Sequence, residues 1–157
     1  MISIKETENF FKSNLFIIII FLIYLLVGIS IFNDYGISFD ENINRTNGFV
    51  SFKYIIELFN LNIDLSPYYK DIPDLSNYQD KAYGVLFDLP LAVLEVTLDI
   101  KDIRDVYLIK HLITFLVFYL SSICFFILCN TIFNDKIFSI LGFIFLIFSP
   151  RIFAESF

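Results

Sequence analysis

Histidine and cysteine are scarce in this chain of 157 residues, which has one His and two Cys. Cys124 and Cys129 lie in the same apolar run, and their spacing places them on different faces of a helix. The sequence therefore indicates neither a disulfide nor a metal site. Because no Cys/His cluster is present, there is no zinc signal. We expect neither a metal nor a cofactor.

Positive charge is also in short supply, since 11 Lys/Arg stand against 17 Asp/Glu and give a net charge of −6. Residues 33–105 alone hold 13 Asp/Glu and 6 Lys/Arg, a net charge of −7. Binding of nucleic-acid phosphates requires a basic face. The sequence therefore predicts that nucleic acid is not a partner.

Apolar residues are what the chain has in excess. They make up 57% of it, Phe alone occurs 21 times, and the mean hydropathy is +0.74. Soluble domains have apolar fractions nearer ~45–50%. The surplus predicts an integral membrane protein whose first partner is the lipid bilayer.

The first apolar run extends from Leu15 to Phe32 and approaches the ~20 residues that a helix needs to cross a bilayer. A secretory signal peptide is the competing interpretation. Its apolar core has ~7–15 residues and ends in small residues before a cleavage site. This run is longer and ends in Ile31-Phe32-Asn33. The sequence favours an uncleaved span over about residues 14–32.

A helix over about residues 39–60 is predicted next. Ser38-x-x-Glu41 matches a capping box, with Ser38 as the N-cap residue. Behind it, apolar residues recur at helical spacing, so the helix is amphipathic and we expect it to lie along the membrane interface. Gly48 weakens the first half of this prediction.

The remainder of the segment 33–105 is predicted to be a loop over residues 62–82, then a second interfacial or half-buried helix over 83–98. Lys5 and Lys12 favour a cytoplasmic N-terminus, which places the segment 33–105 on the external, periplasmic side. We expect a multi-pass protein of the cell inner membrane.

Two further spans are predicted, over about residues 110–129 and 133–149. The apolar part of the last, Ile137–Ser149, has only 13 residues, which cover about 20 Å of a ~30 Å hydrocarbon core. The predicted fold class is an all-α integral membrane protein with three transmembrane helices and a long external loop carrying interfacial helices. Because no polar tail follows the last span, we expect the chain to be part of a longer protein.

Asp40 and Glu41 form a pair of adjacent carboxylates close to the predicted membrane surface. Carboxylates in a first helical turn complement the helix dipole, so capping is one interpretation. A carboxylate that accepts a proton from a hydroxyl or amine during catalysis is the other. A capped helix is also a rigid mount, so the two roles are compatible.

The order of a first span, an external Asp-Glu pair and interfacial helices resembles the GT-C membrane glycosyltransferases. Within them it resembles family 39, which includes the protein O-mannosyltransferases and the aminoarabinose and other lipid-sugar transferases. Lys110-His111-Leu112 at the head of one span, and Ser149-Pro150-Arg151 with the residues to Phe157 after another, also resemble bacterial members. The resemblance extends over the whole chain but covers only the first few spans of the family.

The resemblance implies that Asp40 is the general base acting on the acceptor and that Glu41 helps to position the acceptor or donor. It implies a polyprenyl-phosphate-linked sugar as donor, transferred with inversion to a lipid, glycan or protein acceptor. The phosphate leaving group requires cationic or hydrogen-bonding partners, for which His111 and Arg151 are candidates. A headgroup anchor is the other interpretation of Arg151, and an interfacial residue bonded to a neighbouring loop is that of His111.

A non-catalytic membrane protein is the competing function, either an assembly partner or a transporter fragment, and an inactive remnant is a third. A transporter usually has ionisable groups inside its spans. In this chain the acidic residues gather outside the predicted spans, which favours chemistry at the membrane surface.

Overall fold

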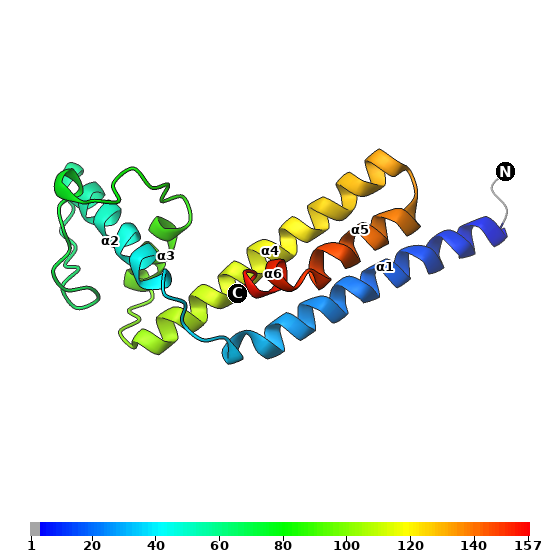
Figure 1. Ribbon diagram of the computed structural model, residues 1–157, viewed down its shortest axis with the longest axis horizontal. Coiled ribbons are helices and arrows are strands. Elements are labelled where there is room, and N and C mark those ends of the chain that lie inside the picture. The colour runs from blue at the N-terminus through cyan, green and yellow to red at the C-terminus, as the bar shows by residue number, and fades with distance from the viewer. Residues whose placement is uncertain (1–3) are drawn as a thin grey trace. The chain divides into compact units, whose positions relative to one another are not determined.

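The computed structural model describes residues 4–157, with side chains from residue 15 onward, and within that range it is all-helical (Figure 1). This confirms the predicted all-α class. The helices are α1 (Ile4–Ile31), α2 (Glu41–Leu58), α3 (Asp88–Thr97), α4 (Ile103–Phe133), α5 (Lys136–Phe148) and α6 (Pro150–Ala154), with short 3-10 turns η1 (Phe32–Asp34) and η2 (Leu75–Asn77).

The chain divides into two compact units. The first, here called the long-helix unit, contains the residues up to Tyr35 together with His111–Phe157. The second, here called the loop unit, is Gly36–Lys110 and contains α2 and α3. Each unit has its own buried cluster of apolar residues.

Two helices among the described residues are long and apolar enough to cross a membrane. They contain the segment Leu15–Asp34, of 20 residues, and the 31-residue helix Ile103–Phe133. Helix α5 is also apolar but has 13 residues, so it reaches about 20 Å, short of a ~30 Å hydrocarbon core. Two of the three predicted spans therefore have the required length, and the third does not.

The long-helix unit is held together by aromatic rings. Phe21 and Tyr24 of α1, Phe115 of α4 and Phe143 of α5 form its buried cluster, and these three helices run side by side in Figure 1. A Cβ atom at Gly28 would lie 1.9 Å from Cζ of Phe115. The absence of a side chain at Gly28 is therefore what allows the Phe115 ring to pack against α1.

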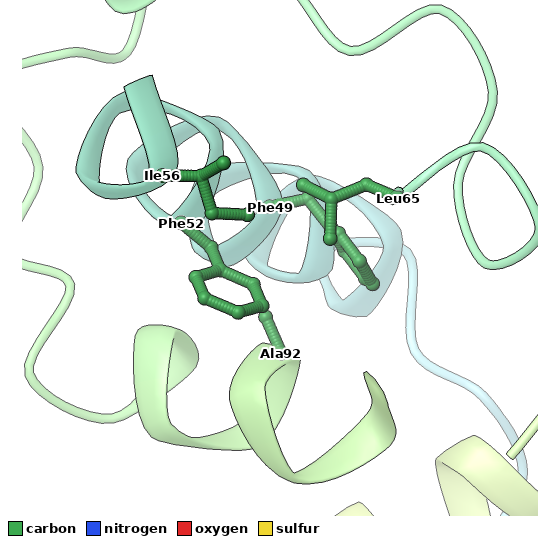
Figure 2. Close-up of a cluster of buried hydrophobic side chains, with 5 residues drawn as sticks. All are labelled: Phe49, Phe52, Ile56, Leu65 and Ala92. Atoms are coloured by element: carbon green, nitrogen blue, oxygen red, sulfur yellow. The ribbon is translucent and has the colours of Figure 1, made fainter. Parts of the chain in front are cut away.

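The loop unit has a smaller apolar core in which α2 packs on α3. Figure 2 shows this cluster, which consists of Phe49, Phe52, Ile56, Leu65 and Ala92. A Cβ atom at Gly48 would lie 2.4 Å from the backbone oxygen of Asp88 and 3.3 Å from Cβ of Ala92. Gly48 thus permits a close crossing of the two helices, which explains a glycine inside α2.

The amphipathic character of α2 has a different use from the predicted one. The helix is present, but three of its apolar side chains, Phe49, Phe52 and Ile56, are buried by α3 and Leu65. The face that was expected to lie along the membrane interface is therefore largely covered by the protein itself.

Polar contacts fasten the loop between α2 and α3 to the polar side of α2. Lys53 Nζ donates to Asp74 Oδ1 at 2.6 Å and to the Ile72 carbonyl at 3.0 Å. The Tyr78 hydroxyl donates to Asn47 Oδ1 at 2.6 Å. Residues predicted as a plain loop are in this way attached to the helix that carries the Asp-Glu pair.

Candidate functional site

The start of α2 carries the predicted general base. The helix begins at Glu41, so Asp40, and not Ser38, is its N-cap residue, and the Asp40 side chain makes no capping hydrogen bond. Glu41 fulfils half of the predicted capping box, because its Oε1 accepts from the Ser38 N–H at 2.7 Å. The exposed Asp40 carboxylate is therefore not committed to capping the helix.

Lys110 connects this helix start to the start of α3. Its Nζ donates to the Glu41 carbonyl at 3.5 Å, and its positive charge acts on the half-buried Asp88. Burial raises the pKa of the Asp88 carboxyl, and the charge of Lys110 opposes that rise. In the sequence Lys110 stands out only as the neighbour of His111, whereas in the loop unit its ammonium group binds the backbone at the Asp-Glu pair.

A buried ion pair lies one helical turn further along α2. Arg45 Nε donates to Glu95 Oε2 at 3.0 Å, and its Nη2 donates to Glu95 Oε1 and to the Tyr68 carbonyl. The Arg45 and Glu95 side chains are only 11% and 4% exposed. The guanidinium also lies 5.4 Å from the Phe49 ring centroid and 5.1 Å from that of Tyr69, which is within cation–π range.

No pattern in the sequence predicts this ion pair directly. A signal was present, since Glu95 is an acid inside an otherwise largely apolar helix, and a buried carboxylate requires a charged or hydrogen-bonding partner. Its partner is 50 residues away in sequence, and no local pattern points to it.

A cavity of about 30 Å³ lies between α2, α3 and the start of α4. Its charged lining residues are Arg45, Asp88, Glu95 and Lys110. A space of this size and polarity accommodates water but is far smaller than the ~300–1,000 Å³ pockets that hold small-molecule ligands.

The two predicted phosphate-binding residues belong to the long-helix unit. His111 lies on α4 and is buried, whereas Arg151 is exposed at the beginning of α6. The backbone of Ser149 is extended because the ring of Pro150 disfavours the helical conformation at the residue before it. This break, followed by Pro150 at the first position of α6, is what brings Arg151 to the end of α5. Asp40 and Glu41 belong to the loop unit.

An apolar groove of about 470 Å³ also lies in the long-helix unit, between α1, α5 and α6. Its lining residues are Ile20, Ile23, Tyr24, Val27, Ile144, Ile147, Phe148, Pro150 and Phe153. Its volume and lining suit an apolar chain.

Among the described residues there is no group of three or more His, Cys, Asp or Glu side chains placed to hold a metal ion. Cys124 is exposed and Cys129 is buried, and both are free thiols.

Comparisons with protein-family models, with curated proteins and with solved structures find no match for this chain.

Proposed function

We propose that this chain supplies the first spans and the catalytic loop of a GT-C type membrane glycosyltransferase. The enzyme transfers a sugar from a polyprenyl-phosphate donor to a lipid, glycan or protein acceptor at the outer face of the membrane. The observation that carries the proposal is the position of Asp40. Its exposed carboxylate makes no capping bond and stands six residues after the end of the apolar segment Leu15–Asp34.

In this reaction the acceptor hydroxyl oxygen attacks C1 of the sugar on the side opposite the phosphate. The hydroxyl proton passes to the Asp40 carboxylate. The bond between C1 and the phosphate oxygen breaks, its electron pair leaves with polyprenyl phosphate, and the configuration at C1 inverts. Glu41 accepts from the Ser38 N–H and so fixes the backbone that presents Asp40.

Two features of the long-helix unit fit the donor. The exposed guanidinium of Arg151 is permanently charged and suits the leaving phosphate. His111 is buried and is the weaker candidate. The apolar groove between α1, α5 and α6 suits part of an isoprenyl chain.

The topology is part of the same proposal. The loop unit is external or periplasmic in a multi-pass inner-membrane protein, and α5 with α6 forms the third crossing. The positive residues Lys5 and Lys12 before the first span support this orientation.

The substitution Asp40→Asn tests the catalytic role, because it preserves shape and hydrogen bonding but removes the proton acceptor. Membranes containing the protein would be supplied with radiolabelled mannosyl, glucosyl or aminoarabinosyl polyprenyl phosphate, and release of polyprenyl phosphate would be measured. We expect turnover to fall roughly 10²–10⁴-fold, with insertion and helix content unchanged.

Asp34→Asn is the matched control, since Asp34 is also exposed and lies six residues earlier; it should retain turnover. Normal transfer by the Asp40→Asn protein would refute the catalytic assignment. The assay uses the full-length protein that contains this chain, and if that unaltered protein transfers none of these sugars, the non-catalytic alternative is favoured. In that case the loop unit, which is stabilised by its own ion pair and hydrogen bonds, would be a binding surface for other membrane proteins.

A further inference from the structure

Two apolar side chains of the loop unit are almost fully exposed. Phe39 is 90% exposed and Leu86 is 92% exposed, more than any other large apolar side chain among the described residues. Each stands two residues before a helix, Phe39 before α2 and Leu86 before α3. Single exposed apolar residues are common, so their exposure alone indicates nothing.

The two side chains belong to the same end of the loop unit. Lys110 Nζ donates to the Glu41 carbonyl at 3.5 Å, and its charge acts on Asp88. Asp88 and Lys110 also line the same small cavity, so the start of α3 lies near the lysine that binds the start of α2. The turn that carries Leu86 is fixed to α3, because the Leu89 N–H donates to the Val85 carbonyl at 3.0 Å.

This end is also where the chain enters and leaves the loop unit, which begins at Gly36 and ends at Lys110. Phe39 follows the membrane-length segment Leu15–Asp34 by five residues, and Lys110 lies seven residues after the start of α4, two residues before its apolar part begins at Leu112. Phe39 is thus close in sequence to one segment that is suited to lipid, and Leu86 lies two residues before Asp88, which shares a small cavity with Lys110.

The negative charge of the loop unit disfavours contact between a large part of its surface and the membrane. It contains 12 Asp/Glu and 7 Lys/Arg, a net charge of −5. Anionic headgroups attract basic segments and by the same reasoning repel a broad acidic surface. A contact limited to two apolar side chains avoids most of that repulsion.

We propose that Phe39 and Leu86 insert into the headgroup boundary of the bilayer, so that the loop unit stands on the membrane by its helix starts and α2 does not lie flat. The occupant of this surface is lipid. The proposal does not depend on glycosyl transfer, and it stands or falls separately from the role of Asp40.

The chain contains no tryptophan, so single-tryptophan proteins provide a direct test. Phe39→Trp and Leu86→Trp would be made in the full chain and reconstituted in phosphatidylcholine vesicles with or without brominated acyl chains. Phe59→Trp is the matched control, because Phe59 is 67% exposed and is the C-cap residue of the 18-residue α2. It lies about 27 Å along the helix from the start of α2.

We expect Trp fluorescence in the Phe39→Trp and Leu86→Trp proteins to be quenched several-fold more strongly by bromolipid than in the Phe59→Trp protein. Acrylamide in the water should show the reverse order. Hydrogen exchange of α2 and α3 verifies that each variant is folded. If the tip variants are quenched by acrylamide as strongly as the control and not by bromolipid, the proposal is wrong. Equal bromolipid quenching at all three positions also overturns it, because α2 then lies flat.

Discussion

The two units of this protein are both helical but are stabilised by different interactions. In the long-helix unit the centre is a set of packed rings, with Phe21 4.4 Å from Phe143 between ring centroids and Phe115 stacked 5.1 Å from Phe157. In the loop unit a small apolar core is joined by the Arg45–Glu95 ion pair and by hydrogen bonds from loop side chains.

The proposed topology, with the long helices in lipid and the loop unit in water, accounts for this difference. Helices in lipid gain little from burying apolar surface against each other, so close packing, often at small residues, decides how they associate. A unit in water gains from its apolar core, and a buried ion pair is tolerated only when both charges are matched. The comparison predicts that charge changes affect the loop unit and ring changes affect the long-helix unit.

The largest effect is expected from breaking the buried ion pair. Arg45→Met leaves the Glu95 carboxylate buried without its partner, which should cost about 3–5 kcal/mol. Hydrogen exchange of α2 and α3 in the full chain in detergent micelles should then accelerate roughly 10²-fold to several thousand-fold, since ~1.4 kcal/mol corresponds to tenfold. Exchange in α1 should not change.

Lys53→Met is the control for this prediction, because Lys53 pairs with the largely exposed Asp74 and such pairs contribute about 0–1 kcal/mol. The double change Arg45→Met with Glu95→Leu should recover most of the loss, since no unpaired charge remains. Equal losses from Arg45→Met and Lys53→Met would show that burial of the pair is not what distinguishes the loop unit.

A smaller effect is expected at the two close-contact glycines. Gly48→Ala places a methyl group against the Asp88 backbone, so the helices must separate at a cost of about 1–3 kcal/mol. Gly28→Ala instead places a methyl group against the Phe115 ring. Because this obstacle is a side chain, a smaller residue at position 115 can relieve the clash. Denaturant unfolding in detergent should show that Phe115→Leu offsets the Gly28→Ala loss.

Ala92→Gly is the corresponding second change in the loop unit and should not offset Gly48→Ala, because the obstructing atom there is a backbone oxygen. The interaction energy of each pair can be read from a double-mutant cycle. Rescue of Gly48→Ala by Ala92→Gly would place the tight contact on the side chain and not on the backbone.

The smallest effect concerns two aspartates of the loop unit. Burial raises the pKa of Asp88 above its ordinary 3.8. A hydrogen bond from the Tyr68 hydroxyl at 2.6 Å, followed by that from Lys101, lowers the pKa of Asp99. In a carbon-13 NMR titration of labelled aspartate, Asp99 should therefore titrate below 3.8 and Asp88 above it.

The signs of the two contributions to stability are opposite. The Asp99 contribution is present above pH 3.8 and is lost as the pH falls through its lowered pKa. The Asp88 contribution is present below pH 3.8 and is lost as the pH rises through its raised pKa. Tyr68→Phe should move the Asp99 pKa back toward 3.8 and leave Asp88 unchanged; coincident titration of both residues in the unaltered protein would contradict the assignment.

Helices were predictable from the sequence because their signals are local. The apolar runs identify α1, α4 and α5, and the amphipathic pattern over residues 39–60 identifies α2, which extends from Glu41 to Leu58. The hydrogen bond that the Ser38 N–H donates to Glu41 also follows from the capping-box pattern, although Asp40 and not Ser38 is the N-cap residue. Periodicity and capping depend on residues within one or two turns of each other, so the sequence displays them directly.

Contacts between distant residues were decided by the tertiary structure alone. The pairing of Arg45 with Glu95, the approach of the Asp88 backbone to Gly48 and the covering of the apolar face of α2 by α3 all join segments that are separated by a long loop. Local periodicity shows that a face is apolar but not what covers it. The catalytic assignment of Asp40 and the roles of Glu41, His111 and Arg151 stay predictions, because a carboxylate or a cation shows its chemistry only beside a substrate.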